Sequence, residues 1–286
     1  MRGILITNAY WHSESTDALR DLFLKAAEEK DIELTEISND ADFSCVSADF
    51  AILWDKDVRL GALLEKRGIP VFNSPMSVAL CDDKTLTHLA LTDSDIPLPE
   101  TVICPQTFPI NGYKRWDFLD RAEKQLGWPM IIKEGRGSFG LQVYLVRDRQ
   151  EAEKILQSKA GQPLLLQRFV ACSSGSDKRL YTVGNKVIAA MRRVNENDFR
   201  ANIFGGGRAF AYIPTPEEER IALSAVKKLG LSFAGVDLID DRDGEGNVHP
   251  LLLEVNSNAQ FLALYDVTGV NPASHMLEYI LSRVEA

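Results

Sequence analysis

Three polar residues in the last third of the chain could hold a metal ion. Asp237 lies in the apolar run 234–240, and Glu254 and Asn256 lie in the apolar run 250–258. Both runs are typical of buried strands, and the glycine- and aspartate-rich segment between them favours a hairpin. Glu254 and Asn256 are two residues apart, so they share one face of their strand. Two carboxylates and an amide oxygen suit Mg²⁺, which keeps water and substrate phosphates as its other ligands. The pattern therefore predicts a magnesium site.

A glycine-rich segment precedes this candidate site in the chain. Gly135, Gly137 and Gly140 form the pattern G-x-G-x-x-G, which in a dinucleotide-binding fold lies between a strand and a helix. Here residues 141–148 alternate like a strand, so the glycines join two strands of a hairpin and the dinucleotide-binding interpretation fails. A glycine hairpin can cover phosphates, because its backbone N–H groups approach the oxygens closely. A mobile hairpin without a ligand is the alternative.

Other familiar catalytic patterns are absent from the sequence. Lys133 precedes the glycines, whereas the lysine of protein kinases follows them, and neither H-R-D nor D-F-G occurs. Lys84 follows Asp83 rather than a glycine, so there is no Walker loop. No Ser-His-Asp or Cys-His arrangement can be argued. The four histidines have no ligand spacing and are expected to be solvated or structural: His12, His88, His249 and His275.

The composition narrows the class of protein. The chain has 286 residues, which suggests about two domains. The 32 basic and 41 acidic residues give a net charge of -9, which argues against a non-specific nucleic-acid binder. No apolar segment approaches the ~20 residues of a membrane span, and the apolar run at the N-terminus is too short for a signal peptide. The four cysteines are far apart, so we expect reduced thiols in a cytoplasmic protein.

The elements that must position these residues follow from the apolar pattern. Apolar runs at 3–8 and 50–54, with helical patterns between and after them, predict a parallel sheet with right-handed crossovers. Ligands of such sheets lie beyond the carboxyl ends of the strands, which makes 8–12 and 54–57 candidate pocket loops. Ordinary surface loops are an equal alternative. A proline-rich segment after residue 95 predicts a domain boundary there, between residues 1–95 and 96–286.

With these motifs in their order, the chain resembles the RimK-type branch of the ATP-grasp enzymes. The resemblance covers nearly the whole chain and includes the following segments: DDKTLTHLAL, IIKEGRGSFG, LLLQRFV, GSDKRLYTVGN, MRRVNENDFRANIFGGG, AGVDLI and LLLEVNSN. It implies an α/β (α+β) architecture, with a Rossmann-like pre-ATP-grasp domain over 1–95 and an ATP-grasp domain over 96–286. The nucleotide is then clasped between a glycine-loop subdomain of about 100–170 and a metal-binding subdomain of about 171–286.

The resemblance also implies roles for particular residues. Lys84, Lys133 and Arg200 are the catalytic cations at the ATP phosphates, the hinge 167–170 contacts adenine through its backbone, and Asp177 lies near the ribose. The implied ATP-binding set is Lys84, Lys133, Gly137, Ser138, Gly140, Gln167, Arg168, Phe169, Val170, Asp177, Arg200 and Asn202. The implied metal ligands are Asp237, Glu254 and Asn256, holding Mg²⁺ with Mn²⁺ as an alternative. Arg168 stands where glutamate is usual in the family.

The activity that the resemblance implies is the ligation of a carboxylate to an amine. The carboxylate takes the γ-phosphate of ATP to give an acylphosphate and ADP, and an amine then displaces phosphate. Catalysis of this kind depends on charge neutralisation and positioning. A phosphotransferase that stops after phosphorylation and a non-catalytic nucleotide-binding module are the alternatives.

The substrate is expected to be a small amino acid or peptide, with a protein or carrier tail as another acceptor. Relatives are often dimers or tetramers, so a homo-oligomer is a further expectation, and neither nucleic acid nor membrane is an expected partner. The candidate substrate residues are Arg179, Arg193, Arg208 and Asn258. Arg192 and Arg193 are adjacent in a strand, so they must point to opposite faces and only one of them can reach the substrate.

Overall fold

The N-terminal part of the protein is built on a parallel sheet. The computed structural model describes residues 1–285, and its first sheet has the strand order β2-β1-β3-β4. The strands are β1 (Arg2–Thr7), β2 (Glu33–Ser38), β3 (Phe50–Leu53) and β4 (Val71–Phe72), and the helices between them are α1 (Glu14–Glu28) and α2 (Val58–Lys66). Both helices begin at a capping side chain, Ser13 for α1 and Asp57 for α2, which accepts hydrogen bonds from otherwise unpaired N–H groups. The predicted parallel sheet is confirmed.

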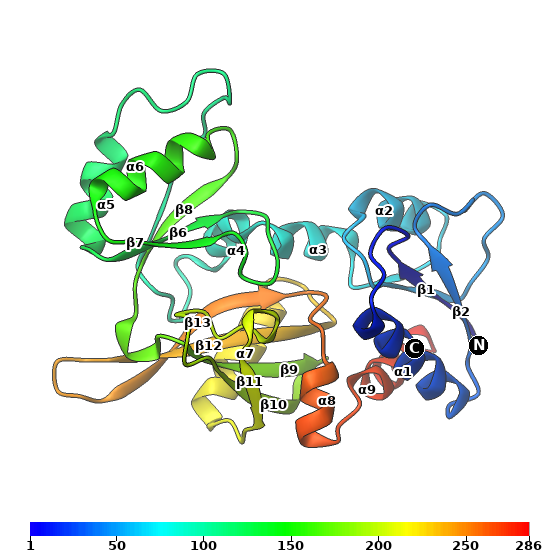
Figure 1. Cartoon of the computed structure of the whole chain (residues 1–286). Helices are drawn as coiled ribbons and strands as arrows, with labels where there is room; N and C mark the ends of the chain where they lie inside the picture. Colours follow the sequence, from blue (N-terminus) through cyan, green and yellow to red (C-terminus); the bar gives the residue numbers. More distant parts are fainter. Residues whose placement is uncertain (286) are drawn as a thin grey trace.

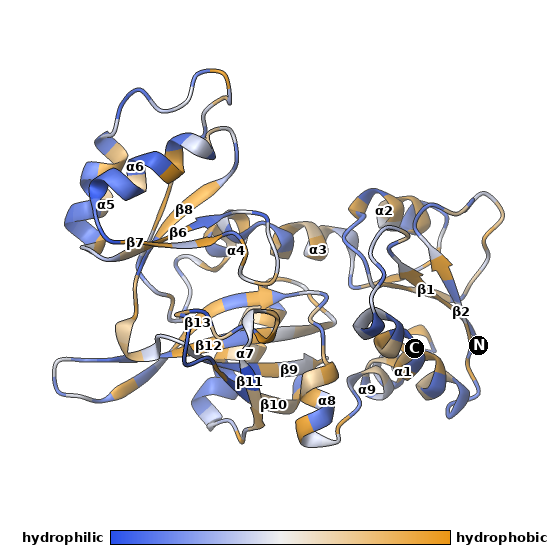
Figure 2. Ribbon diagram, viewed as in Figure 1, coloured by the Kyte–Doolittle hydropathy of each residue, from blue (hydrophilic) through white to orange (hydrophobic). Residues whose placement is uncertain are grey.

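The second sheet is antiparallel and carries the glycine loop. Its order is β5-β8-β6-β7, and two amphipathic helices cover it, at the upper left of Figure 1. The elements are β5 (Thr101–Ile103), α5 (Asp117–Leu126), β6 (Met130–Glu134), β7 (Val143–Val146), α6 (Arg149–Ser158) and β8 (Leu164–Arg168). Apolar residues fill the strands, whereas the outer faces of α5 and α6 are hydrophilic (Figure 2). Lys133 of β6 pairs with Val143 of β7, so the glycines do join two strands of a hairpin, as predicted.

The third sheet is antiparallel and carries the predicted metal ligands. Its order is β11-β10-β9-β12-β13. The strands are β9 (Ser176–Val183), β10 (Lys186–Val194), β11 (Arg208–Ala211), β12 (Phe233–Arg242) and β13 (Val248–Asn256), with the helices α7 (Pro216–Lys228), α8 (Leu262–Thr268) and α9 (Pro272–Val284). The predicted β12–β13 hairpin is confirmed, and its register sets Asp237 directly opposite Glu254.

Two short helices connect the N-terminal sheet to the space between the other two sheets. These are α3 (Pro75–Asp82) and α4 (Lys84–Leu91), which lie between the sheets in Figure 1. Asp83 separates them, because its extended backbone ends α3 while its side chain accepts from the N–H groups of Thr85 and Leu86 at the start of α4. Lys84 is therefore fixed as the first residue of a helix.

The first and third sheets share one hydrophobic core. One buried cluster contains Phe23 of α1 and Phe50 of β3. The same cluster contains Phe233 of β12, Phe261 just before α8, and Ile280 of α9. Helix α9 packs beside α1, and the two ends of the chain lie near one another in Figure 1. The boundary near residue 95 therefore stays a prediction, because burial joins residues on both sides of it. No helix within residues 1–285 combines the length and the apolar character needed to cross a membrane.

Candidate active site

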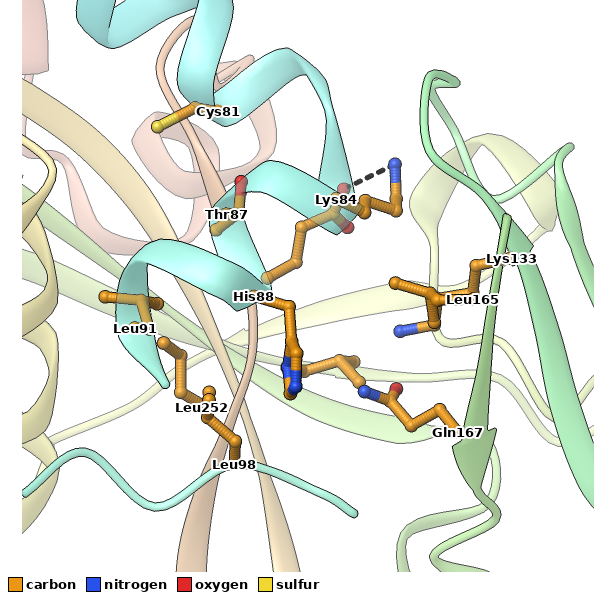
Figure 3. A pocket seen from close by; sticks show the side chains of 12 residues that line it. Cys81, Lys84, Thr87, His88, Leu91, Leu98, Lys133, Leu165, Gln167 and Leu252 are labelled. Atoms are coloured by element: carbon orange, nitrogen blue, oxygen red, sulfur yellow. Dashed lines mark ion pairs between the residues drawn. The ribbon is translucent and has the colours of Figure 1, made fainter. Parts of the chain in front are cut away.

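A small cavity lies where α4, the β6–β8 sheet and β13 meet (Figure 3). Lys84 and His88 line it from α4, Lys133 from β6, Gln167 from β8 and Glu254 from β13. Its other end is apolar and is formed by Leu91, Leu98 and Leu252. A cavity with a polar end and an apolar end suits a ligand with a charged group and a ring. Its volume is about 30 Å³ in this conformation.

Lys84 connects three elements at the polar end of the cavity. Its ammonium group lies 3.0 Å from Glu254 Oε1 of β13 and donates to the carbonyl of Gly137 in the glycine loop at 3.1 Å. Its backbone N–H also donates to the carbonyl of Gly135 at 2.8 Å. The predicted catalytic lysine, glycine loop and metal ligand are therefore brought together around one side chain.

Lys133 is the most deeply buried cation at this end. Only 7% of its surface is exposed. Burial lowers the pKa of Lys133 to about 8, Glu254 acts in the opposite direction, and the neighbouring Lys84 lowers it further. A buried ammonium group of this kind is strongly attracted to a polyanion, because an anion replaces the water that the group has lost.

The predicted metal ligands are close together, but Asp237 already has cationic partners. Arg179 donates to both carboxylate oxygens of Asp237, with Nε–Oδ1 and Nη2–Oδ2 distances of 2.7 Å, and Arg193 Nη2 lies 2.9 Å from Oδ2. Burial acts to raise the pKa of Asp237, but the two guanidinium groups outweigh it and hold that pKa below its ordinary value. Asn256 Nδ2 lies 3.4 Å from the same carboxylate. Glu254 and Asn256 have oxygen atoms of the kind that Mg²⁺ prefers, so these residues fit a magnesium ion. Asp237 could contribute only an oxygen that also accepts hydrogen bonds from an arginine.

Asp177 extends this buried network. Arg193 donates to its two oxygens at 2.6 and 2.7 Å. Around the cavity and the network, the carboxylates Asp177, Asp237 and Glu254 face four cations: Lys84, Lys133, Arg179 and Arg193. Four positive charges against three negative ones leave an excess of one positive charge. The region therefore favours the binding of an anion. A metal dication is expected to bind there only together with an anion.

Arg200 and Asn202 hold the far side of the glycine loop. Arg200 donates from Nη1 to the carbonyl of Gly140 at 2.8 Å and is itself held by Asp198. Gly140 has a φ of +74°, which favours glycine, and a Cβ there would lie 2.7 Å from Asn202 Oδ1, so the Asn202 side chain would have to move. Residues 200–202 therefore contact the loop directly.

Both candidate pocket loops of the N-terminal sheet also contact the glycine loop. Lys56 donates to the hydroxyl of Ser138 at 3.1 Å. Trp11 stacks on Phe139 with ring centroids 5.4 Å apart, and Phe204 packs on the same ring at 5.2 Å. Three separate parts of the chain therefore meet on one loop, and the interpretation of 8–12 and 54–57 as pocket loops stays a prediction that these contacts favour.

The hinge residues differ in what they face. Gln167 lines the cavity and donates to Thr101 Oγ1 at 2.9 Å. Arg168 pairs with Asp241, Phe169 packs edge-on against Phe199, and Val170 is buried in a small apolar cluster. Only Gln167 of this group lines the cavity with its side chain.

The structure separates the four candidate substrate residues. Arg179 and Arg193 lie together against Asp237, whereas the side chain of Arg208 is 68% exposed and pairs with Glu196. Asn258 contacts the N-terminal sheet by donating to the carbonyl of Asp55 at 2.7 Å. Arg192 is exposed and its neighbour Arg193 is buried, which confirms that they point to opposite faces of β10.

Sequence reasoning missed His88. We expected a solvated or structural histidine, but its side chain lines the cavity (Figure 3). Burial, and then the charge of Lys133, lowers its pKa from the ordinary 6.5, so the ring is held neutral. Its spacing from Lys84 was the available signal, because residues four apart on a helix lie on the same face.

Comparison with known proteins identifies the family. A family model described as a RimK-like ATP-grasp domain matches residues 81–280. The chain is 34% identical to a probable α-L-glutamate ligase of Mannheimia succiniciproducens over 77% of this chain and 70% of that protein. A RimK-domain ATP-grasp protein of Sphaerobacter thermophilus has the same fold, with a TM-score of 0.73, 21% identity and coverage of 98% and 99% of the two chains. So has the D-alanine–D-alanine ligase of Bacillus anthracis solved with ATP, with a TM-score of 0.74, 18% identity and coverage of 99% and 97%. The chain therefore belongs to the RimK-like ATP-grasp family of carboxylate-amine ligases.

Proposed function

We propose that this protein joins the carboxylate of one substrate to the amine of an amino acid or peptide, using ATP and passing through an acylphosphate. The observation that carries the proposal is the position of Lys84. Its ammonium group contacts both the carbonyl of Gly137 and the carboxylate of Glu254. The loop that covers phosphates and the strand that offers metal ligands therefore meet at one cation, which is where a phosphoryl group would be transferred.

The roles of the chain's own residues follow from this arrangement. Lys133, Lys84 and Arg200 neutralise and orient the phosphates of ATP, and the apolar end of the cavity with Gln167 receives the adenine ring. Glu254 and Asn256, with a shared oxygen of Asp237, would hold Mg²⁺. That ion would supply further positive charge at the phosphates. Closure of the glycine loop excludes water, which would otherwise hydrolyse the acylphosphate.

ATP binding requires the cleft to widen. Sites for small molecules and cofactors have volumes of ~300–1,000 Å³, whereas this cavity has about 30 Å³. The direct ion pair between Lys84 and Glu254 narrows the polar end. When ATP binds, we expect α4 and β13 to move away from β6. A phosphate group would then replace Glu254 as the partner of Lys84, and a metal ion would replace Lys84 as the partner of Glu254.

The amine substrate that we propose is an α-amino acid, with L-glutamate as the first candidate, because a relative at 34% identity is named as a probable α-L-glutamate ligase. The substrate that supplies the carboxylate is proposed to be a second amino acid or, as the alternative, a peptide or a protein tail. The free thiols of all four cysteines and the need for ATP favour the cytoplasm as the place of action. A homo-oligomer stays a proposal that sedimentation can test.

Nucleotide analysis tests the reaction type. The protein is incubated with ATP, Mg²⁺ and a pool of amino acids and cell metabolites. ADP and free phosphate that appear only with the pool support the ligase, and dividing the pool then identifies the substrates. AMP with pyrophosphate would overturn the acylphosphate route. A stable phosphorylated product would show a phosphotransferase instead, and tight ATP binding with no turnover would show either a binding module or a macromolecular substrate that the pool lacks.

A further inference from the structure

A polar cluster lies at the carboxyl ends of three strands in the N-terminal sheet. Asn8 follows β1, Asn39 follows β2 and Asp55 follows β3. The two asparagines donate to the two carboxylate oxygens of Asp55, each at 3.0 Å. Asp55 is only 9% exposed. This end of a parallel sheet is where ligands bind in folds of this type.

Asn258, two residues after the end of β13, joins the cluster and leaves one atom without a partner. Its Nδ2 donates to the backbone carbonyl of Asp55 at 2.7 Å. Its Oδ1 is buried and accepts no hydrogen bond, and within residues 1–285 it is the one buried side-chain oxygen or nitrogen in that condition. A buried acceptor without a donor is unfavourable, and proteins keep very few of them. A donor from outside the chain, either a water molecule or a group of a bound substrate, would satisfy this atom.

The position of Asn258 places that donor at the reacting end of the site. The residue is two positions after Asn256, whose amide contacts Asp237. Lys56, adjacent to Asp55, reaches Ser138 of the glycine loop. The cluster thus contacts the end of β13 through Asn258, and the residue next to Asp55 contacts the glycine loop.

The chemistry of the orphaned atom selects among the reactants. An amide oxygen only accepts hydrogen bonds, and so do an ionised carboxylate and an ionised phosphate. The carboxylate substrate and the ATP phosphates therefore cannot satisfy Oδ1, and the adenine ring belongs at the far, apolar end. The remaining reactant of a ligase is the amine, whose N–H groups are donors.

We propose that Asn258 Oδ1 accepts a hydrogen bond from the attacking amine of the substrate, with the Asp55 carboxylate providing the negative surroundings that attract it as an ammonium ion. This inference rests on the ligase function proposed above. The ammonium ion first gives one proton to water, and a hydrogen bond from the neutral amine to Oδ1 then leaves the nitrogen lone pair free to point at the acylphosphate carbonyl. The C–N bond forms, the C–O bond to phosphate breaks, phosphate leaves with the electron pair, and the second proton lost by the nitrogen passes to the phosphate. Oδ1 is buried in this conformation, so the amine reaches it when the cleft opens.

Steady-state kinetics of Asn258→Leu and Asn258→Ser test the proposal. The leucine variant keeps the side-chain size without an acceptor, and the serine variant keeps a small polar group if leucine prevents folding. The probe is a mixture of the proteinogenic amino acids with ATP and Mg²⁺. We expect the half-saturating concentration of the amine substrate to rise about tenfold to a hundredfold, with that of ATP unchanged. Hydroxylamine at high concentration should still trap the acylphosphate as a hydroxamate, because carboxylate activation does not use Asn258.

Asn247→Leu is the matched control, since this asparagine lies on the exposed β12–β13 turn and pairs with Asp243. It should leave every parameter unchanged. An unaltered amine dependence in both Asn258 variants would overturn the inference while leaving the ligase function intact. A wild-type protein that forms no ADP with the mixture would instead contradict the ligation of free amino acids, which is the form of the proposed function on which this test rests.

Discussion

Arg193 and Asp237 form an ion pair in which both side chains are almost completely buried, with Nη2 and Oδ2 2.9 Å apart. The same guanidinium group also binds Asp177, and Arg179 holds the other side of Asp237. A predicted metal ligand is thus fixed by two strands that lie far from it in the sequence. The network positions β12 against β9 and β10, and it sets the charge that an incoming nucleotide meets.

Replacing Arg193 with methionine should destabilise the protein severely. The change leaves Asp177 without its guanidinium partner and Asp237 with one partner instead of two. Removing one member of a buried ion pair typically costs about 3–5 kcal/mol in the free energy of unfolding. Urea unfolding followed by circular dichroism measures this loss.

Arg192→Met is the matched control for that experiment. Arg192 precedes Arg193 on the same strand, but its side chain is exposed and donates to Ser176. Its removal should change the free energy of unfolding by less than about 0.5 kcal/mol. Equal destabilisation by the two substitutions would show that the buried network does not exist as described.

Substitutions at the polar end of the cavity should abolish turnover and leave the fold intact. Glu254→Gln keeps an acceptor for Lys84 but removes a charge that would hold Mg²⁺, and Lys133→Ala removes a buried cation. We expect ADP formation to fall by ~10²–10³ in each, as when one preorganised charged group is deleted from other active sites. The exposed Glu196→Gln, whose carboxylate pairs with Arg208, should keep wild-type activity. Near-normal turnover in either Glu254→Gln or Lys133→Ala would refute the site assignment.

The local features of the site could be predicted from the sequence because they depend on short-range pattern. The strand–turn–strand pattern around the glycines predicts the β6–β7 hairpin, and the alternation around Arg192 and Arg193 predicts that the two point to opposite faces. Spacing also places Glu254 and Asn256 on one face. Each of these follows from the two-residue period of a strand.

The partners of Asp237 could not be predicted in this way. Arg179 and Arg193 come from β9 and β10, and their approach depends on how β12 pairs with β9 and β9 with β10. Such register is set by the whole buried face and not by neighbouring residues. For the same reason, the apolar pattern of residues 1–95 does not reveal that Phe23 and Phe50 share a core with α9.

His88 should make stability sensitive to mild acid. Its pKa is lowered in the folded protein, first by burial and then by Lys133, so the unfolded chain takes up a proton at a higher pH than the folded protein does. The free energy of unfolding therefore falls as the pH drops below 6.5, the ordinary pKa of histidine. We expect the urea midpoint of His88→Gln to decline less than that of the wild type between neutral pH and about pH 5.

The exposed His275→Gln variant is the control for this pH series, since its side chain lies at the surface of α9. It should follow the wild-type curve throughout. If His88→Gln also followed that curve, the buried and neutral state of His88 would be contradicted.

Trp11 should control how well the glycine loop excludes water. Its ring stacks on Phe139 at an interplanar angle of 10°, and such a pair contributes about 0.5–1.5 kcal/mol beyond its buried area. Trp11→Ala should therefore destabilise the conformation in which the glycine loop is closed, and water should gain access to the acylphosphate. We expect more ADP to be released for each amide formed, with ATP binding almost unchanged, as measured by parallel nucleotide and product analysis.

Tyr10→Ala, which removes a neighbouring ring that is 84% exposed, should leave the ratio of ADP to amide at the wild-type value. Phe139→Ala should have at least the effect of Trp11→Ala, because it also removes the contact with Phe204, and adding Trp11→Ala to Phe139→Ala should give no further increase. Additive effects would mean that the two rings act on the loop independently, and this would contradict the stacked arrangement.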